Sequence, residues 1–335
     1  MTERKNTNTL SRIATVGTYR LLLAICVLLS HVGIQFFGHN QGVSAVISFF
    51  LLSGFVMTAL IRRNYDSKGK IKKFYLDRVL RLFPQFIFYL VATLIFVAIT
   101  NYKDPFLEEL SALKIVMNAL MLPLSLYMLG LEKSLLIPPT WSLGLELTFY
   151  ISIPFLLLYR VERYAFLLSL CVFGLAYFGV INTDFFGYRL LPGTLFIFLL
   201  GSFLYESKST ERISFLITTY VISLIAFLWV LHDSTFMRPY SFEVLLGILV
   251  GLPIVAGLIR LPSGKIDAVL GNISYGVFLN HFPLMWIFQA LKIGFDTTGA
   301  IAALIATSIA LGWLTYHLVE KPVLIVRRSL RLGQN

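Results

Sequence analysis

The first apolar segment of the chain reads Tyr19-Arg-Leu-Leu-Leu-Ala-Ile-Cys-Val-Leu-Leu-Ser-His31-Val-Gly33. A helix here places Arg20 and His31 on nearly the same face, because eleven steps of about 100° come close to three full turns. The rise between them is about 16 Å, roughly half of a ~30 Å hydrocarbon core. With Arg20 at one membrane surface, His31 lies near the midplane, where an ionisable side chain is by default a candidate functional residue. The alternative is a histidine that only hydrogen-bonds between packed helices.

The composition is that of a membrane protein. Hydrophobic residues make up 57% of the 335 positions and charged residues 13%, and the mean hydropathy is +0.80. A soluble domain carries about 25% charged residues. The long apolar runs favour an all-α polytopic membrane protein over an outer-membrane barrel. We expect the net charge of +11 to reflect basic cytoplasmic loops rather than nucleic-acid binding. Cys26 and Cys171 lie inside apolar segments, so we expect neither a disulfide framework nor a metal site.

About ten transmembrane helices are expected, in a single domain that covers residues 1–335. They lie near 17–36, 42–61, 84–100, 141–159, 164–181, 188–205, 213–231, 241–259, 272–291 and 299–319. A further apolar stretch, 110–131, contains Pro123 and Lys114, and we expect it to be re-entrant or interfacial. With both termini cytoplasmic, this arrangement leaves only six of the 28 Lys and Arg residues outside, in agreement with the positive-inside rule. An eleventh span at 110–131 would reverse every later loop.

A basic segment precedes the third predicted span. Residues 71–84 combine an apolar stripe with four cations, which predicts an amphipathic helix that lies at the interface and runs into Pro84 at the start of the span. One interpretation is a positive-inside anchor on anionic lipids. The other is an anion site, because Arg78 and Arg81 are three residues apart on one helix face and could bind the phosphates of a nucleotide-containing donor.

Two further ionisable residues lie inside predicted spans. Glu146 is about 7 Å inside the start of the span 141–159, on its outer half, and shares a face with Ser142. A lone carboxylate there must be protonated, paired or in a watered cavity. His281 is about 15 Å inside the span 272–291, again near the midplane. Glu320 falls at the cytoplasmic interface, where we expect an ion pair with Arg20, Arg78 or Arg81. The histidines His39 and His232 are expected to be solvated in outer loops.

Six motifs occur in the order found in one known family. They are Arg20-x10-His31, Ser48-Phe-Phe-Leu-Leu-Ser-Gly-Phe55, Phe74-Tyr-x2-Arg78-x2-Arg81-x2-Pro84, Trp141-Ser-Leu-x2-Glu146-x2-Phe-Tyr150, Ser274-Tyr-x3-Leu-x-His281-x-Pro283 and Val319-Glu-Lys-Pro322. The chain resembles the acyltransferase family 3, integral membrane O-acyltransferases that modify cell-surface carbohydrates such as lipopolysaccharide or exopolysaccharide. Lys321 and Asn280 depart from the pattern we expect of that family.

The resemblance implies a reaction and a role for each candidate residue. The donor would be cytoplasmic acetyl-CoA or another acyl-CoA, with its phosphates near Arg20, Arg78 and Arg81. His31 would act as general base on an acceptor hydroxyl or as a transient acyl carrier. Glu146 and His281 would orient the acceptor, a glycan that could be lipid-linked, or relay its proton. The expected location is a bacterial inner membrane, with membrane lipids around the protein and no metal in the site.

Two other functions fit the same residues. A proton-coupled transporter or permease also uses midplane histidine and glutamate residues, although no internal repeat of the kind found in many transporters is evident. A lipid-binding scaffold would use the buried histidines only for packing. Binding of acyl-CoA would separate the acyltransferase from both alternatives.

Overall fold

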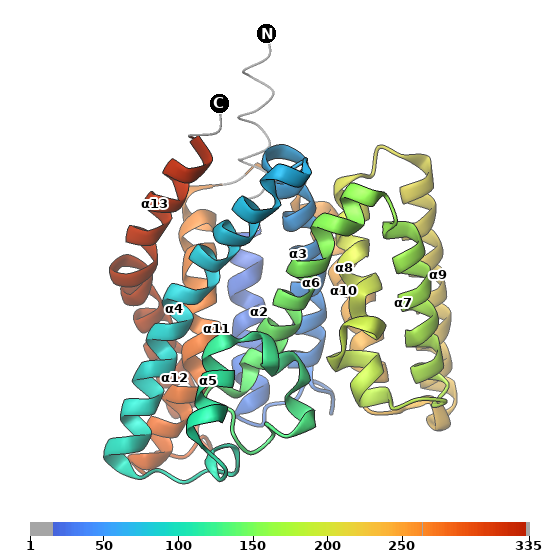
Figure 1. Cartoon of the computed structure of the whole chain (residues 1–335). Coiled ribbons are helices and arrows are strands. Elements are labelled where there is room, and N and C mark those ends of the chain that lie inside the picture. The colour runs from blue at the N-terminus through green and yellow to red at the C-terminus, as the bar shows by residue number, and fades with distance from the viewer. Residues whose placement is uncertain (1–15, 263, 333–335) are drawn as a thin grey trace.

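The computed structural model describes residues 16–262 and 264–332, and this part of the chain is an all-helical bundle (Figure 1). Its long helices are α2 (Gly17–His31), α3 (Gln41–Asn64), α4 (Ile71–Thr100), α6 (Trp141–Tyr159), α7 (Glu162–Tyr177), α8 (Leu191–Tyr205), α9 (Thr210–His232), α10 (Ser241–Leu258), α11 (Lys265–Ala290), α12 (Thr298–Thr315) and α13 (Lys321–Leu332). Short helices connect them: η1 (Lys68–Lys70), η2 (Pro105–Leu107), α5 (Ala112–Leu120), η3 (Leu122–Leu129), η4 (Pro138–Thr140), η5 (Phe185–Arg189), η6 (Ser234–Phe236) and η7 (Tyr316–Glu320).

The two ends of the bundle differ in charge. One end holds the start of α2, the end of α3 and the start of α4, with the basic residues between 62 and 81, and we call it the basic end. It is at the top of Figure 1. The other end, which we call the opposite end, holds the last residue of α2 and the long connection from α4 to α6.

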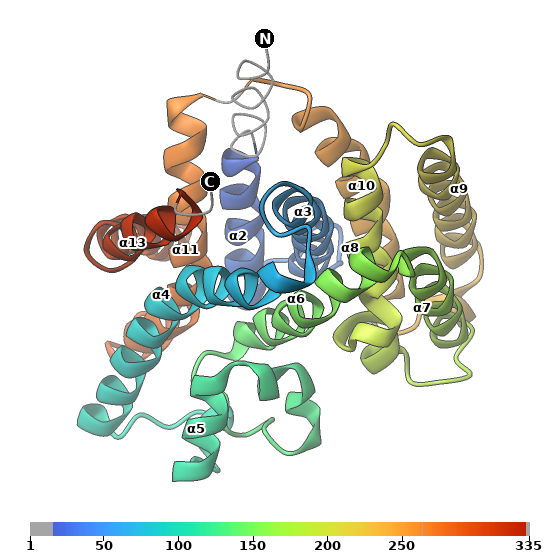
Figure 2. The same cartoon turned by 45° about the horizontal axis from the view of Figure 1, so that its top comes forward.

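Helix α3 is the centre of the bundle, and α2, α8 and α10 pack around it (Figure 2). A serine–glycine step such as Ser53-Gly54 in an apolar helix permits either a close backbone approach or a bend. The structure has the close approach, because a Cβ on Gly54 would lie 1.7 Å from the backbone oxygen of Phe198 in α8. The contact is reciprocal, since a Cβ on Gly201 of α8 would lie 1.9 Å from the backbone oxygen of Leu51. Small residues at such crossings let membrane helices pack closely.

Helices α2 and α11 pack closely and are aligned by a carboxylate. Helix α2 has no side-chain cap of its own. Asp267, in the first turn of α11, accepts hydrogen bonds from the backbone N–H groups of Gly17 (3.2 Å) and Thr18 (2.7 Å) and from the Thr18 hydroxyl (2.8 Å). This satisfies two of the N–H groups that a helix start leaves unpaired and places a negative charge at the positive end of the helix dipole. The contact fixes the position of α2 along the axis of α11.

The ten predicted segments each overlap a helix, but ten spans are not confirmed. By length and apolar character, seven segments within the described residues can cross a membrane, namely Gln41–Asn64, Lys68–Thr100, Pro138–Tyr159, Phe185–Tyr205, Thr210–His232, Ser241–Leu258 and Thr298–Arg327. Helices α2 and α7 are shorter, with 15 and 16 residues, whereas a full span takes about 20. The chain is an integral membrane protein, and these seven apolar segments are its candidate spans.

The stretch 110–131 does not form one long helix. It divides into α5 and η3 at Met121, whose φ of +62° breaks the helix before Pro123. Residues of η3 pack on the start of α6, where a Cβ on Gly144 would lie 2.5 Å from the Ser125 backbone nitrogen. The stretch therefore agrees with the prediction that it is not an eleventh span.

The helix predicted over residues 71–84 is present, but the helix of the span does not begin at Pro84. Helix α4 runs without interruption from Ile71 to Thr100, and Pro84 lies inside it. Its inward face carries Phe74, Asp77 and Arg78, all buried, whereas Leu76 and Val79 of the predicted apolar stripe are exposed. The face is reversed because the buried cation has acidic and aromatic partners within the bundle and the apolar side chains face outward.

Candidate active site

His31 and His281 form a hydrogen-bonded pair at the packed surface of α2 and α11. His31 Nδ1 lies 3.0 Å from His281 Nε2, and the two rings are nearly parallel, with an interplanar angle of 13°. His31 is the last residue of α2, which ends five residues earlier than predicted because the chain turns at Val32 and at Gly33, where φ is +85°. The exposure of the two side chains differs, since His31 is exposed and His281 is fully buried.

The hydrogen bonds define which nitrogen of each neutral ring carries the proton. His281 Nδ1 lies 3.0 Å from the backbone oxygen of Val277, which can only accept, so this nitrogen is the donor. In a neutral His281 the Nε2 atom is then unprotonated and accepts from His31 Nδ1–H. This leaves the lone pair of His31 Nε2 free. The pair is thus arranged so that a buried histidine fixes the tautomer of an exposed one, which is the arrangement a general base requires.

Phe282 of α11 packs against both histidines, and the connection between α4 and α6 packs in turn on Phe282. Phe282 contacts the His31 ring edge to face at 5.2 Å between ring centres, and Phe106 of η2 packs edge to face on Phe282. The connection is tied to α11 because Trp286 Nε1 donates a hydrogen bond of 3.0 Å to Asp104. The sequence analysis did not single out these residues, and the only signal was that the connection is long and contains aromatic residues.

Glu146 lies in a different part of the bundle from the two histidines. It accepts hydrogen bonds from the hydroxyl groups of Ser53 on α3 and Tyr150 one turn further along α6, the latter at 2.5 Å. The predicted partner Ser142 instead donates to the backbone oxygen of Pro139, because a serine in the first turn of a helix can reach the carbonyl three residues before it. The described hydrogen bonds of Glu146 do not link it to His31 or His281.

Arg20 and Arg81 lie together at the basic end, with acidic residues around them. Arg81 forms an ion pair with Glu320, which confirms the expected pairing of that buried carboxylate, and its guanidinium lies 5.4 Å from the ring centre of Tyr275. Arg20 is within electrostatic reach of Arg81, Glu146 and Glu320. Its Nε atom is buried and has no hydrogen-bond partner. A buried guanidinium nitrogen without an acceptor is costly unless a ligand supplies one.

Arg78 faces other partners than Arg81. It pairs with Asp77, which also accepts a 2.7 Å hydrogen bond from Arg327 of α13. Its guanidinium lies 5.9 Å from the ring centres of Phe74 and Tyr150. The expectation that Arg78 and Arg81 share one anion-binding face is therefore not supported, because the two side chains belong to separate ion pairs. Tyr150 still connects Arg78 to Glu146.

His39 is not the solvated side chain that its loop position predicted. Its ring stacks on Phe242 of α10 at 3.5 Å between ring centres, and its Nδ1 lies 3.5 Å from a carboxylate oxygen of Glu243.

Within the described residues, no three His, Cys, Asp or Glu side chains are grouped closely enough to hold a metal ion. Both cysteines are free.

Comparison with known protein families identifies the family of the chain. Residues 18–317 match the model of the acyltransferase family 3, which is described as an acyltransferase domain. The chain belongs to the acyltransferase family 3. The match includes Arg20, both histidines of the pair, Glu146 and the two arginines of α4. The match ends before Glu320. In the structure this residue forms an ion pair with Arg81.

Two kinds of relative are similar to this member of the acyltransferase family 3. An uncharacterized protein of Aquifex aeolicus (strain VF5) is 34% identical over 200 residues, which cover 58% of this chain and 90% of the relative. A Staphylococcus aureus (strain COL) protein named "Putative O-acetyltransferase" is 24% identical over 342 aligned positions, 90% of this chain, and the same name and identity recur in strain MSSA476. This chain spans 56% of the length of those Staphylococcus relatives. No solved structure matches the chain.

Proposed function

We propose that this protein transfers an acyl group, in the first instance acetyl, from an acyl-CoA to a hydroxyl group of a cell-surface carbohydrate. The observation that carries the proposal is the exposed His31 with a free Nε2, held by the buried His281 on one side of α2. The same helix carries Arg20, eleven residues away, with an unsatisfied guanidinium nitrogen. Helix geometry puts about 16 Å between them, which separates a donor-phosphate site from the reacting centre.

In the proposed reaction His31 Nε2 removes the proton from the acceptor hydroxyl as its oxygen attacks the thioester carbonyl carbon. The carbon–sulfur bond then breaks, and the CoA thiolate receives the proton from the His31 imidazolium, so that free CoA and the ester are the products. His281 acts as a positioning residue that keeps the donor hydrogen on His31 Nδ1. General base catalysis of this kind contributes about 10²–10⁴-fold. A transient acyl group on His31 Nε2 would use the same free lone pair.

The donor phosphates are assigned to Arg20 and Arg81. The two guanidinium groups are close enough to interact electrostatically, and among the described residues only that of Arg81 is in an ion pair, with Glu320. A diphosphate would supply acceptor oxygens to the unsatisfied Nε of Arg20, and arginine binds phosphate in a fork geometry. Arg78 contributes by holding Tyr150 beside Glu146, because its own charge is neutralised by Asp77.

Glu146 is proposed to act at the donor side of the site. Its hydroxyl partners hold the carboxylate in place, and its charge acts on Arg20. In the absence of donor it balances the two arginines, and it orients them when the phosphates bind. This differs from the acceptor-orienting role expected from its sequence position, because the partners of Glu146 come from α3 and its own helix rather than from the histidine pair.

Membership of an acyltransferase family favours a transferase over the permease and the lipid scaffold that the sequence left open. Placing the basic end in the cytoplasm of a bacterial plasma membrane puts both termini and the donor arginines on the side where acyl-CoA is made. This orientation follows the excess of Lys and Arg at that end. The acceptor glycan then approaches the exposed face of His31 from the opposite end.

Transfer of label from acetyl-CoA tests the proposal. Membranes that contain wild type, His31→Ala or the matched control His232→Ala at equal levels are given labelled acetyl-CoA and surface glycan of the host. We expect wild type and the control, whose histidine is exposed at the end of α9, to label the glycan equally and His31→Ala to label it at background. Equal labelling by His31→Ala would refute the catalytic role of this residue. No labelling by any of the proteins, together with no binding of CoA, would refute the proposed function.

A further inference from the structure

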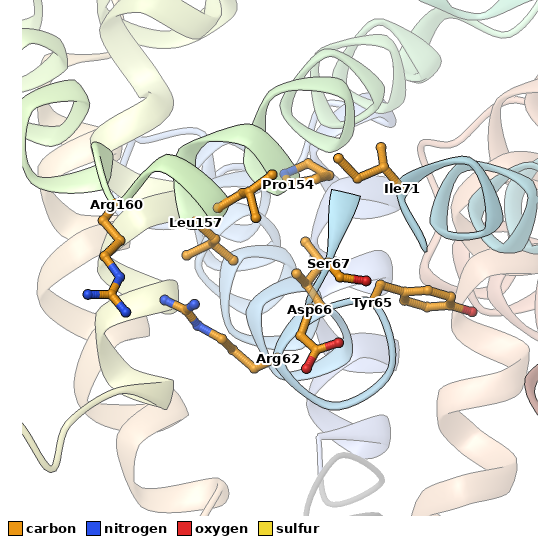
Figure 3. Close-up of a pocket in the computed structure, with 10 residues that line it drawn as sticks. Arg62, Tyr65, Asp66, Ser67, Ile71, Pro154, Leu157 and Arg160 are labelled. Atoms are coloured by element: carbon orange, nitrogen blue, oxygen red, sulfur yellow. The ribbon is translucent and has the colours of Figure 1, made fainter. Parts of the chain in front are cut away.

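A pocket lies at the basic end, apart from the histidine pair, between the ends of α3 and α6 and the connection that leads to α4. Its volume is about 200 Å³. Figure 3 shows the side chains that surround it. They are Ile61, Arg62, Tyr65, Asp66, Ser67, Ile71, Pro154, Leu157, Leu158 and Arg160. Pockets that hold a complete drug-sized ligand have volumes of about 300–1,000 Å³. This smaller pocket therefore has room for only one part of such a ligand.

The pocket has an apolar wall and a polar rim. The wall consists of aliphatic and proline side chains of α3 and α6, and Tyr65 lies beside it. The rim carries two guanidinium groups that lie on the same side of the pocket in Figure 3, those of Arg62 and Arg160. Arg62 is held by Glu206 at 2.8 Å. Arg160 is exposed, and among the described residues no ion pair or side-chain hydrogen bond engages it.

Two helix ends meet at the pocket. Helix α3 ends at Asn64 and α6 ends at Tyr159, and Arg160 is in the left-handed conformation with φ of +55°. The last carbonyl groups of a helix have no intrahelical donor and carry partial negative charge. They therefore favour a ligand with N–H donors at the bottom of the pocket and disfavour an anion there. An anionic group of the ligand belongs at the rim, beside Arg160.

A path of aromatic contacts links this pocket to the donor arginines. Tyr65 packs edge to face on Phe74 at 5.7 Å between ring centres, and Phe74 lies under the guanidinium of Arg78. Arg78 in turn lies on Tyr150, which hydrogen-bonds Glu146 beside Arg20. The pocket and the donor arginines are thus connected by a continuous row of packed side chains.

We propose that the pocket binds the adenine ring of the acyl-CoA donor, with the ribose 3′-phosphate at Arg160. The flat ring suits the aliphatic wall, and its exocyclic amino group supplies the N–H donors that the helix ends require. This inference rests on the proposed function, because it assigns a further part of the same donor. An anionic lipid headgroup also carries a phosphate, but it has no flat ring that could pack on the aliphatic wall. The experiment below distinguishes the lipid from acyl-CoA.

The test compares two donors that share the thioester and the pantetheine arm. Acetyl-CoA carries the adenosine 3′-phosphate, and S-acetyl-4′-phosphopantetheine does not. Ser67 lines the pocket, is exposed and has an extended backbone, so Ser67→Trp fills the pocket without disturbing the core. The matched control is Ser209→Trp, an exposed serine at the start of α9 outside the pocket. All proteins are full length and purified in nanodiscs of zwitterionic lipid.

We expect Ser67→Trp to raise KM for acetyl-CoA about tenfold, which corresponds to about 1.4 kcal/mol, and to leave KM for S-acetyl-4′-phosphopantetheine unchanged. The control Ser209→Trp should change neither. An unchanged KM for acetyl-CoA in Ser67→Trp would overturn the inference. An equal rise for both donors would also overturn it, because the pocket would then act through a lipid or through the fold.

A second variant tests the phosphate at the rim. Arg160→Gly removes the guanidinium at a position whose left-handed backbone favours glycine, so folding is preserved. Its KM for acetyl-CoA should rise about fivefold, as expected for one charge-assisted contact, and its KM for acetyl-dephospho-CoA should equal that of wild type. Lys208→Ala, an exposed cation outside the pocket, should have no effect. Equal effects of Arg160→Gly on both donors would contradict the assignment.

The failure of this inference is distinguishable from failure of the proposed function. If wild type transfers acetyl from neither donor, the proposed function fails. The pocket is then tested directly by binding of adenosine 3′,5′-bisphosphate to the protein in the same nanodiscs. Binding to wild type and its loss in Ser67→Trp would still support a nucleotide pocket, and equal binding to both would overturn it.

Discussion

The two ends of helix α2 have different surroundings. At the basic end Arg20 lies among charges, with Arg81, Glu320 and Glu146 within electrostatic reach. At the opposite end His31 contacts the rings of His281 and Phe282, and within the described residues no carboxylate hydrogen-bonds to it. The same helix thus carries a strongly ionic site and a neutral one.

The difference matches what each step of the proposed reaction requires. Phosphate recognition needs fixed positive charge, and acidic residues nearby hold that charge in place when the donor is absent. A general base must start unprotonated. A carboxylate in the place of His281 would favour the charged imidazolium of His31, whereas a neutral histidine orients the ring without doing so. The predictions that follow test this contrast, from the largest expected effect to the smallest.

Removal of His281 tests the neutral end. His281→Ala leaves His31 Nδ1 without its acceptor, so the ring loses its fixed tautomer, and kcat should fall about 10²–10³-fold with KM for acetyl-CoA unchanged. His281→Gln supplies a carbonyl oxygen as acceptor and should recover part of kcat, which a purely structural role would not explain. Steady-state kinetics with acetyl-CoA measures both. A rise in KM with unchanged kcat would show that His281 belongs to donor binding.

The Asp77 ion pairs test whether Arg78 is structural. Asp77→Asn removes the countercharge of two arginines, Arg78 and Arg327, of which Arg78 is buried, and loss of one partner of a buried pair costs about 3–5 kcal/mol. The thermal unfolding midpoint in detergent should therefore fall clearly, with KM for acetyl-CoA nearly unchanged in protein that remains folded. Glu211→Gln, an exposed carboxylate in the first turn of α9 and outside the pocket, is the control. An unchanged unfolding midpoint together with a raised KM for acetyl-CoA would indicate that Arg78 takes part in donor binding.

Arg20 tests the ionic end. Arg20→Gln removes the guanidinium with the unsatisfied Nε, and KM for acetyl-CoA should rise about 10–100-fold because one or two charge-assisted phosphate contacts are lost. Arg20→Lys keeps the charge but not the fork of donors and should recover little. Arg260→Gln, an exposed arginine near the end of α10, is the matched control. Equal KM values for wild type and Arg20→Gln would remove Arg20 from the donor site.

Substitution of Asp267 tests whether the contact between α11 and the first turn of α2 positions the two ends of α2. Asp267→Asn weakens the cap on the first turn of α2, and stability should fall by about 1 kcal/mol. Because the same contact sets the position of α2 along α11, kcat should fall a few-fold with no change in donor binding. Asp296→Asn, an exposed carboxylate before α12, is the control. A larger effect on donor KM than on kcat would show that the contact does not control the position of His31.

The helices were predictable from the sequence, but most of their contacts were not. Long apolar runs predicted the all-helical architecture and the approximate range of each helix, and the small residues at Ser53-Gly54 were compatible with a close helix contact. The hydrogen bond between His31 and His281 could not be predicted, because it joins residues 250 positions apart. It depends on α2 lying beside α11, and several other helices offered similar apolar faces.

Charged residues were harder to place than apolar ones. An ion pair between Glu320 and one of Arg20, Arg78 and Arg81 was expected because all four residues fall at the same membrane surface, and the structure gives Arg81 as the partner. The orientation of Arg78 was not expected, because an alternation of cations and apolar residues predicts a helix between water and lipid, whereas inside the protein the Arg78 guanidinium pairs with Asp77, a carboxylate that it shares with Arg327. Glu146 was identified as a candidate from its isolation in an apolar segment. Its partner Ser53 became evident only from the packing of α3 against α6, whereas its other partner, Tyr150, is one turn further along the same helix.

The most direct test of the account separates donor binding from chemistry at His31. The rate of a single turnover with bound, labelled acetyl-CoA and saturating acceptor is measured for wild type and His31→Ala in purified form, together with the Kd for CoA. The account predicts an unchanged Kd and a rate that falls about 10²–10⁴-fold in His31→Ala. An unchanged rate, or a loss of rate that follows entirely from weaker CoA binding, would contradict the assignment of His31 as the reacting base.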